Sequence, residues 1–580
     1  MELLKYGIKK HPFLTITAFW LFALCTLGRF AIDKVVPFNY YSALVFSGGF
    51  VLMDILFVRK RMDESRLRKE LVKTGLMTLG ALLYVVVTLY IFNMVPIMTA
   101  LQGRNSAVIF FSGILALVVI ALVITFRREW TYKKGFVYMF GAAFFFHLFF
   151  FICYAFLQQW DLGGDVGVVR NDGNGHLGYI KYLSENILPA QFDPRLKWQY
   201  YHPPLNHYLA AALLKIQMLL GVPFATAIFN LQFMPFLYCM FMIYNIYRAG
   251  REAGLSRLAL MVMTGLTAFC PAFVLMGNYL NNDMLSVLFI TFAIYYTARW
   301  YRTRKTADML LVAFSFGLGM FTKLSVSLAA LPIGIFFIAA LVSSVRKKDM
   351  KDFRKSFGQM CVFVAVAAPL SLYWSLRNYL RFGVPLGYVP VTEDKDQLIT
   401  QSAAERLFDF RIFHFTHHMT VCKSDEMPPP HDYNDYNPLV CLFKTASGNT
   451  AQGPFPYIYW ITIIMGIVSF ACVIYILAAK GSMPGIWKLA MGAFYAATYI
   501  SYVVFCFRYP NLCTEEIRYA SMLIIIGAFC IGLTLKRLLG KKKKSSRRIG
   551  YCMAGLSALY CVISFTLLTA ECLHYIYVVF

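Results

Sequence analysis

The chain has 580 residues, of which 59% are hydrophobic and 14% are charged, and its mean hydropathy is +0.59. A soluble chain carries roughly a quarter charged residues, so this composition excludes a soluble protein and indicates a polytopic integral membrane protein. The formal net charge is +26, but the basic residues form short clusters between apolar runs, where they set membrane topology. This distribution of charge argues against nucleic acid as a partner. It indicates that the protein is surrounded by membrane lipids.

The first 134 residues predict four transmembrane helices. Segment 1–12 is basic and precedes an apolar run without a small-residue cleavage site, which is typical of a retained helix rather than a signal peptide. A span needs about twenty residues, and basic clusters mark its cytoplasmic end. The resulting spans are 14–30, 41–57, 76–98 and 107–126. We expect residues 1–134 to form an N-terminal transmembrane module of their own, whose role the sequence leaves open.

A polar segment, 158–222, follows the next predicted span at 136–157. That span must run outward, which places the polar segment on the extracytoplasmic side. Within it, 171–186 and 203–220 are predicted to be short amphipathic helices at the membrane interface, the second beginning at a proline. A lipid-facing coil would leave backbone amides unpaired, so we interpret this segment as a first extracytoplasmic loop that carries an active site.

The rest of the chain predicts ten further spans. They are 224–247, 258–276, 284–300, two shorter spans that turn near Lys323, 358–374, 457–479, 489–507, 521–535 and 551–568. A second large extracytoplasmic loop is expected over 376–455, and it holds Cys422 and Cys441, which the sequence leaves either bonded or unbonded. The predicted fold is an all-α bundle of about fifteen transmembrane helices, with residues 135–580 as its second module.

Asp172 and His176 are the candidates for chemistry in the first loop. Four residues apart on a helix, they share one face. A carboxyl group that is partly desolvated at the membrane surface has a raised pKa and serves as a general base near neutral pH. The residues alone also fit a plainer role, with Asp172 as a helix cap and His176 as an interfacial hydrogen-bonding group.

Other polar residues fall on the same predicted face of the membrane. His202 precedes two prolines that stiffen the approach to the second interfacial helix, and Asp283 follows two asparagines in a turn that favours these residue types anyway. Lys323 is costly in lipid and is expected at the outer interface or in a cavity. The candidates for binding a lipid phosphate are Lys323, Arg377, Arg508 and Arg518, although interface snorkelling explains each of them singly.

Taken in order, these segments resemble the GT-C superfamily of polyprenyl-phosphate-sugar-dependent glycosyltransferases, and especially the protein O-mannosyltransferases and lipid A aminoarabinose transferases (glycosyltransferase family 39-like). The mannosyltransferases carry Asp-Glu-x-His-Phe-Gly in the first loop. The segment from Asp172 to Gly178 is similar, with one extra residue and no second acid directly after the first. The aminoarabinose transferases have a phosphate-contacting lysine before the Pro-Pro pair, where this chain has His202.

Later segments extend the resemblance from residue 136 to residue 580. NNDM at Asp283 resembles the second-loop aspartate of the superfamily, and GMFTKLS around Lys323 resembles its Gly-Leu-x-x-Leu-Thr-Lys segment. WSLRNYLRFGVPLG and EEIRYAS also look like family segments. The eleven spans predicted over this region equal the span count of the mannosyltransferases.

The resemblance implies an inverting sugar transfer on the extracytoplasmic face. The donor is a polyprenyl-phosphate-linked sugar, and the acceptor hydroxyl belongs to a glycan, lipid or protein that the sequence does not identify. Asp172 is expected to act as general base, and the donor phosphate is expected near His202 and one or more of the basic residues named above. Asp283 would position a substrate, or hold a divalent cation if one is used.

Two other functions share much of this pattern. A polysaccharide ligase or polymerase would use a lipid-diphosphate oligosaccharide, and a lipid-sugar transporter or flippase would move its substrate without chemistry. Against transport, the polar residues gather in loops rather than along broken helices in two matching halves. The absence of an obvious retention signal or luminal domain favours a bacterial cell membrane with the active site facing outside.

Overall fold

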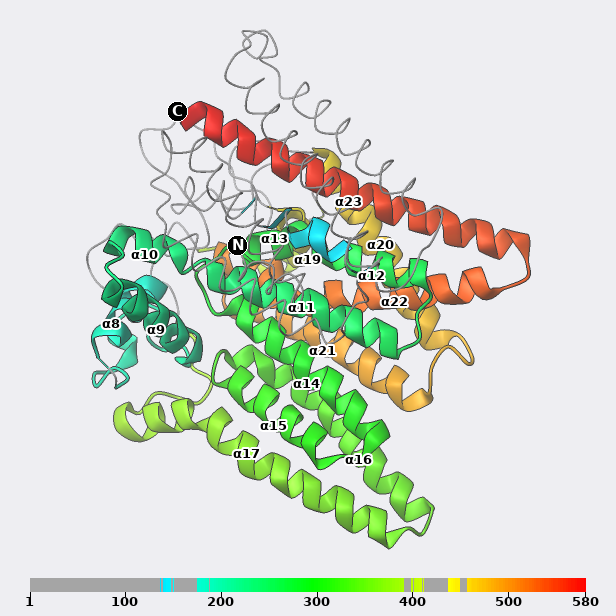
Figure 1. The fold of residues 1–580 in the computed structure, drawn as a ribbon, viewed down its shortest axis with the longest axis horizontal. Coiled ribbons are helices and arrows are strands. Elements are labelled where there is room, and N and C mark those ends of the chain that lie inside the picture. Colours follow the sequence, from blue (N-terminus) through cyan, green and yellow to red (C-terminus); the bar gives the residue numbers. More distant parts are fainter. Residues whose placement is uncertain are drawn as a thin grey trace, which may run out of the picture. The chain divides into compact units, whose positions relative to one another are not determined.

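The structure is a computed structural model, and most of the residues that it describes follow residue 174 (Figure 1). The described residues are 136, 139–144, 146–147, 150, 175–186, 188–390, 398–399, 401–408, 410, 437–448 and 456–579. Residues 217–230 and 578–579 belong to a smaller compact unit, and the rest belong to a larger one, which is considered below. The predicted N-terminal module, Asp172 and Cys422 lie outside the described residues.

The described secondary structure is helical except for one antiparallel β-bridge, between Leu398 and Asn511. The first-loop elements are α8 (Gly175–Glu185), η2 (Pro194–Leu196) and α9 (Leu205–Leu219), followed by α10 (Phe224–Asn230). The longer helices are α11 (Phe233–Glu252), α12 (Arg257–Ala268), α14 (Asp283–Thr303), α15 (Thr306–Met320), α16 (Ala330–Arg346), α17 (Met350–Phe382), α20 (Pro456–Ala478), α21 (Gly485–Arg508), α22 (Met522–Gly540) and α23 (Lys544–Val579). The short elements between them are α13 (Pro271–Met276), η3 (Leu324–Ala329), α18 (Ala403–Phe408), α19 (Pro438–Ala446), η4 (Leu512–Thr514) and η5 (Ile517–Tyr519).

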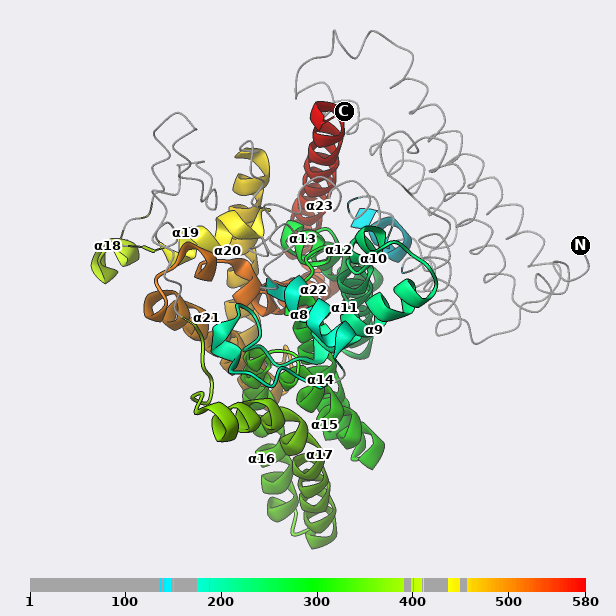
Figure 2. The same ribbon diagram turned by 90° about the vertical axis from the view of Figure 1, so that its left-hand side faces the viewer.

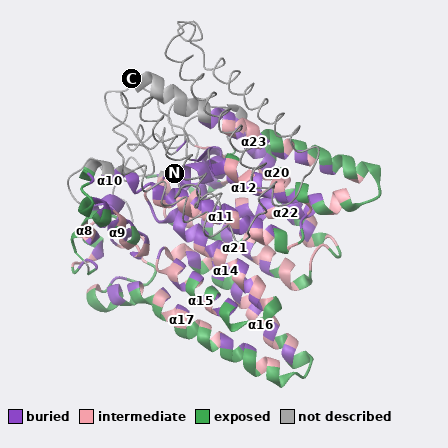
Figure 3. Ribbon diagram, viewed as in Figure 1, coloured by how far each residue is buried: buried purple, intermediate pink, exposed green. Residues whose placement is uncertain are grey.

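Six helices of the described chain are long and apolar enough to cross a membrane, and α12 and α15 are shorter apolar helices. Large apolar side chains are exposed along one edge of α17, including Val364, Leu372 and Leu380, and Figure 3 shows this edge as largely exposed. A continuous apolar surface of this kind is stable against lipid rather than water. The structure thus confirms an all-α integral membrane protein.

The structure corrects two predicted spans, 224–247 and 258–276, each of which is two helices rather than one. Both breaks lie at prolines. In a continuous helix, the ring of Pro235 would clash with the carbonyl of Leu231, and α11 begins instead at Phe233. Pro271 is the first residue of α13, where a missing backbone N–H costs nothing.

The break between α12 and α13 frees backbone carbonyls inside the helical bundle. Cys270, the residue before the proline, is extended, with φ −69° and ψ 124°. His147 Nε2 donates to the carbonyl of Ala268 at 2.7 Å, and Ser564 Oγ donates to the carbonyl of Phe269 at 2.5 Å. These side chains replace the lost helical bonds, which is the condition for a broken helix in a membrane.

Helix α15 packs closely between α14 and α17. A Cβ atom on Gly317 would lie 2.9 Å from Leu370 Cβ and 3.3 Å from Ala367 Cα. Small residues allow helices in membranes to approach in this way, and the close approach fixes α15, whose end leads to Lys323.

Gly317→Val is therefore expected to destabilise the protein by about 1–3 kcal/mol, because it overpacks the contact between α15 and α17. The measurement is the thermal unfolding midpoint of the purified protein in detergent. Gly334→Val is the matched control, since a Cβ atom at Gly334 of α16 meets nothing within 4 Å. Equal midpoints for the two variants would contradict the packing argument.

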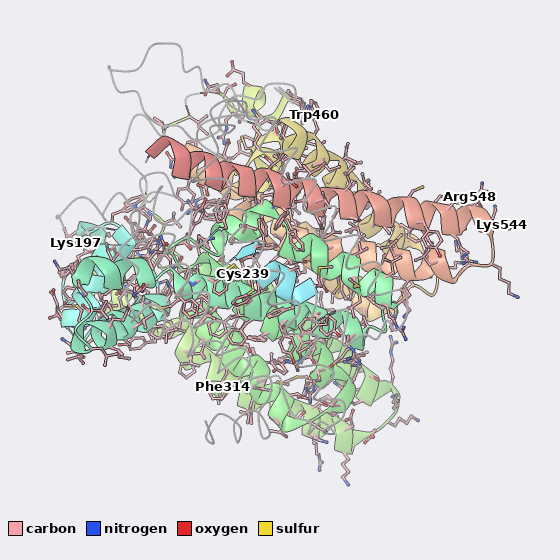
Figure 4. The ribbon with its side chains drawn as sticks, turned by 45° about the horizontal axis from the view of Figure 1, so that its top comes forward. Lys197, Cys239, Phe314, Trp460, Lys544 and Arg548 are labelled. Carbon is pink, nitrogen blue, oxygen red and sulfur yellow. The ribbon has the colours of Figure 1, made fainter. Side chains whose placement is uncertain are left out.

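Helices α16 and α17 run side by side (Figure 2). A short turn joins α22 to α23 in a second, more open hairpin (Figure 1). Lys544 and Arg548 lie at the tip of the α22–α23 hairpin, and Lys197 of the first loop lies at the opposite end of the larger unit (Figure 4). Basic clusters at one end and the first loop at the other are the arrangement that the predicted topology requires.

Candidate functional site

The turn before α14 brings Asp283 against Lys323. Asn281 Oδ1 accepts from the backbone N–H of Asp283 at 2.9 Å, which fixes the start of α14. Asn282 Nδ2 donates to the carbonyl of Thr322 at 3.1 Å, which holds the break between α15 and η3 beside that turn. In this break, Lys323 is extended and its ammonium group forms an ion pair with the Asp283 carboxylate. The predicted turn at Lys323 is confirmed.

Arg518 and Glu516 complete the charged part of the site. Arg518, in η5, lies with Nη1 3.8 Å from Asp283 Oδ2 and with Nε 2.9 Å from Glu516 Oε2. The ammonium group of Lys323 also lies over the ring of Tyr519, 5.0 Å from its centroid. Burial lowers the pKa of Lys323 against the opposing effect of Asp283, and burial raises the pKa of Glu516 although Arg518 opposes it.

Three histidines from the first loop stack beside these charges. The rings of His176 and His202 are 5.7 Å apart and nearly parallel, and His176 Nδ1 lies 2.8 Å from His207 Nε2. One of the two bonded nitrogens carries the proton and the other accepts it. Burial and then neighbouring positive groups, including Lys323 and Arg518, hold the pKa values of His176 and His202 well below the usual range.

One backbone and one side-chain hydrogen bond join the first loop to the two turns. The N–H of Leu205, at the start of α9, donates to the carbonyl of Phe321 at 3.0 Å. Asn206 Nδ2 donates to the carbonyl of Asn281 at 2.9 Å. The two prolines before Leu205 have no backbone N–H group. The N–H of Leu205 is therefore the first donor at this end of α9, and it bonds to the turn before Lys323. Segments that are distant in sequence thereby form one site, at the starts of α9 and α14 and the end of α15.

The remaining predicted site residues lie elsewhere or outside the described chain. Arg377 is buried in α17, where it donates to the carbonyl of Ala190 and to Asn378 Oδ1. Arg508 ends α21 and lies over the ring of Tyr509, 5.6 Å from its centroid. The structure therefore brings together His176, His202, Asp283, Lys323 and Arg518, and it gives Arg377 and Arg508 other neighbours.

A divalent cation does not fit the surroundings of Asp283. Its two carboxylate oxygens face Lys323 and Arg518, which are cations rather than further metal ligands. Among the described residues, no group of three or more His, Cys, Asp or Glu side chains has the geometry of a metal site. The role that these contacts support for Asp283 is to hold the two basic side chains in place.

The buried histidines predict acid sensitivity of the fold. Burial lowers the pKa of His207 to about 3, from 6.5 in the unfolded chain. Below pH 6.5 the unfolded state binds a proton that the folded state excludes, so stability is complete above that pH and declines as the pH falls toward 3.

His207→Gln should flatten this decline by about 1.4 kcal/mol per pH unit. The measurement is the free energy of unfolding in detergent at several pH values between 7.5 and 4.5. Lys215→Gln, an exposed position on the same helix α9, is the control and should leave the slope unchanged. An unchanged slope in His207→Gln would mean that His207 is charged in the folded protein.

Residues 201–374 match the family model described as dolichyl-phosphate-mannose-protein mannosyltransferase. The matched segment contains His202, Asp283 and Lys323 of the site. This match confirms the resemblance to the GT-C membrane glycosyltransferases. No curated protein matches the chain in sequence.

Some solved structures are also similar to this chain, at low sequence identity. One is the archaeal oligosaccharyltransferase AglB from Archaeoglobus fulgidus, in complex with an inhibitory peptide and a dolichol-phosphate, with a TM-score of 0.45 and 12% identity over 76% of this chain. This chain spans 56% of that protein's length. The others are ArnT from Cupriavidus metallidurans in the apo state (TM-score 0.33, 13% identity, 70% of this chain and 77% of that one) and bound to undecaprenyl phosphate (0.34, 14%, 77% and 78%).

Two members of the site, His207 and Glu516, are not among the residues predicted from the sequence. His207 follows His202 by five residues, and it is buried because α9 turns it toward α8. Glu516 stands two residues before Arg518 in the EEIRY segment, where an acid beside a predicted phosphate-binding arginine was the available signal. The burial of Glu516 could not be predicted from the sequence, because it depends on how the connection between α21 and α22 folds.

Proposed function

We propose that this protein is an inverting glycosyltransferase that moves a sugar from a polyprenyl-phosphate carrier to an acceptor hydroxyl. The observation that carries the proposal is the meeting of Lys323 and Arg518, each with a side chain 12% exposed, at the buried carboxylate of Asp283 and next to the stacked histidines. The match to a family that uses dolichyl-phosphate-mannose supports the choice of donor class.

Lys323 and Arg518 are suited to bind the donor phosphate. A buried cation is costly unless it is paired, and here Asp283 and Glu516 compensate the two positive charges before any substrate enters. A phosphate would take charge-assisted hydrogen bonds from both cations. Neutral His202, held beside them, adds a hydrogen-bonding group on the side of the first loop.

The reaction needs one base and one anion site. Asp172 accepts the proton of the acceptor hydroxyl as its oxygen forms a bond to the anomeric carbon. The bond from that carbon to the phosphate oxygen breaks, and the electron pair leaves with the polyprenyl phosphate. Because the leaving group is a stable anion, cationic contacts suffice to stabilise it and no general acid is needed. This differs from a glycosidase, which uses two carboxyl groups across the bond.

The proposed setting is the outer face of a bacterial cell membrane, with residues 1–134 as a separate N-terminal module. Sequence topology places the site opposite the basic cytoplasmic clusters. A lipid-linked donor would reach it sideways from the bilayer, and the acceptor would be a glycan, lipid or protein on the outer side.

A panel of radiolabelled donors tests the proposal. Purified protein is incubated with polyprenyl-monophosphate monosaccharides, with a lipid-diphosphate oligosaccharide in parallel, and transfer or slow hydrolysis is measured. Turnover of a monophosphate donor is the expected result. Turnover of the diphosphate donor alone would replace the proposal with a ligase or polymerase, and flux into proteoliposomes without a covalent product would replace it with transport.

A further inference from the structure

Lys323, Arg518, Asp283 and Glu516 are called the phosphate site here, and Arg406 is not one of them. Its side chain is nevertheless only 2% exposed. It belongs to α18, in the second extracytoplasmic loop, whose start is fixed by reciprocal hydrogen bonds between Ser402 and Glu405. Arg406 Nη2 lies 2.6 Å from Glu515 Oε1 and also donates to the carbonyl of Cys506 at 2.9 Å. An arginine of a polar loop is thus bound inside the protein against the end of α21.

Glu515 belongs to residues 509–521, which link α21 to α22 and are called the site connection here. The second loop docks on this connection at two further points. The N–H of Ile399 donates to the carbonyl of Pro510 at 2.8 Å, and the N–H of Ile517 donates to Thr445 Oγ1 at 2.8 Å. The loop therefore contacts the connection near its start, at Pro510, and further along it, at Glu515 and Ile517.

The adjacent acids Glu515 and Glu516 form ion pairs with different arginines. Glu515 meets Arg406, and its second oxygen accepts from Cys441 Sγ at 3.0 Å. Glu516 meets Arg518, which reaches Asp283 in the phosphate site. A shift of Glu515 by the length of a hydrogen bond must also move its neighbour Glu516, because one peptide unit joins them.

We propose that Arg406 is a positioning residue, which anchors Glu515 and thereby holds Arg518 where it binds the donor phosphate. The inference rests on the proposed function for the identity of the ligand. Removing one partner of a buried ion pair leaves the other charge uncompensated. Without Arg406, we therefore expect the connection to rearrange so that the Glu515 carboxylate reaches water. Arg406 contacts Glu515, the carbonyl of Cys506 and the ring of Phe507, so its proposed effect reaches Arg518 through Glu515.

Donor affinity in a double-mutant cycle tests this role. Arg406→Met should weaken binding of radiolabelled undecaprenyl phosphate by about tenfold or more, close to the effect of Arg518→Met. If Arg406 acts through Arg518, the double variant should bind no more weakly than Arg518→Met alone, because contacts in one network are not additive. Arg354→Met, an exposed position on α17, is the control and should bind like the wild type. Effects of Arg406→Met that are equal with and without Arg518 would overturn the inference.

Hydrogen–deuterium exchange separates this inference from the proposed function. Amides of the site connection, among them Ile517, should exchange faster in Arg406→Met than in the wild type whatever the ligand is. If Arg406→Met does not fold, Arg406→Lys replaces it, since a lysine keeps the charge but reaches fewer acceptors, and a smaller change in both measurements is expected. Faster exchange in Arg406→Met, with no binding of undecaprenyl phosphate by the wild type, would refute the proposed ligand but support the role of Arg406 as an anchor of the connection. Unchanged exchange in a folded Arg406→Met variant would refute that role.

Discussion

Replacing Asp172 with asparagine should lower kcat by about two to four orders of magnitude, which is the contribution of a positioned general base. Asparagine keeps the size and the hydrogen-bonding capacity of the side chain but cannot take a proton from the acceptor hydroxyl. The donor KM should change little, because the proposed phosphate contacts come from Lys323, Arg518 and His202. The measurement is the rate of transfer over a range of concentrations of the donor that the wild type accepts, which gives both kcat and the donor KM.

Asp165→Asn is the matched control for this experiment, since Asp165 is another acid of the same first loop. It should retain wild-type turnover. A large loss in Asp165→Asn together with normal turnover in Asp172→Asn would move the base to the earlier residue. Losses in both would point to a loop that needs both acids, and Asp172 would then not be the sole base.

Replacing Lys323 with methionine should raise the donor KM or Kd by about 10- to 100-fold. A hydrogen bond to a charged group contributes about 1.5–3 kcal/mol, and each 1.4 kcal/mol is about tenfold in affinity. Methionine preserves much of the side-chain length, so the change removes the charge rather than the packing. The KM should rise more than kcat falls, because the phosphate is held both before and during the reaction.

In Lys323→Met, the Asp283 carboxylate loses its closest partner, the Lys323 ammonium group. The double variant Lys323→Met with Asp283→Asn removes both charges, and it should recover stability without recovering donor affinity. Lys305→Met is the matched control, because Lys305 is exposed at the opposite end of α15. Donor affinity unchanged in Lys323→Met would remove Lys323 from the phosphate site.

Membrane physics explains why much of the fold was predictable. Lipid requires apolar spans of nearly fixed length and leaves basic residues at one end, so helices such as α20, α21 and α22 could be placed to within a few residues. The same rule placed a turn at Lys323, since a lysine is too costly for the middle of a span. It failed at Pro271, because a proline break in a membrane depends on side chains elsewhere that take over the freed carbonyls. His147 and Ser564 do so here.

The candidate site was predictable in its parts but not in its assembly. His176, His202, Asp283, Lys323 and Arg518 were singled out as polar groups of the outer loops, and the structure brings them together. Arg377 and Arg508 had the same residue type and predicted side of the membrane, yet they contact other groups. Residue type and predicted side of the membrane do not reveal which helix ends meet. The meeting of helix ends decides which of the predicted residues belong to the site.

The sequence by itself determined the class of protein and a family resemblance, and it predicts a side of the membrane for each loop, because all three depend on local composition and on spacing along the chain. Only the tertiary structure decided that Glu516 balances Arg518 and that Arg406, from a loop more than a hundred residues earlier, is buried against Glu515. The physical reason is that a buried charge is tolerated only beside a partner, and the partners are chosen by the packing of distant segments rather than by their order in the chain.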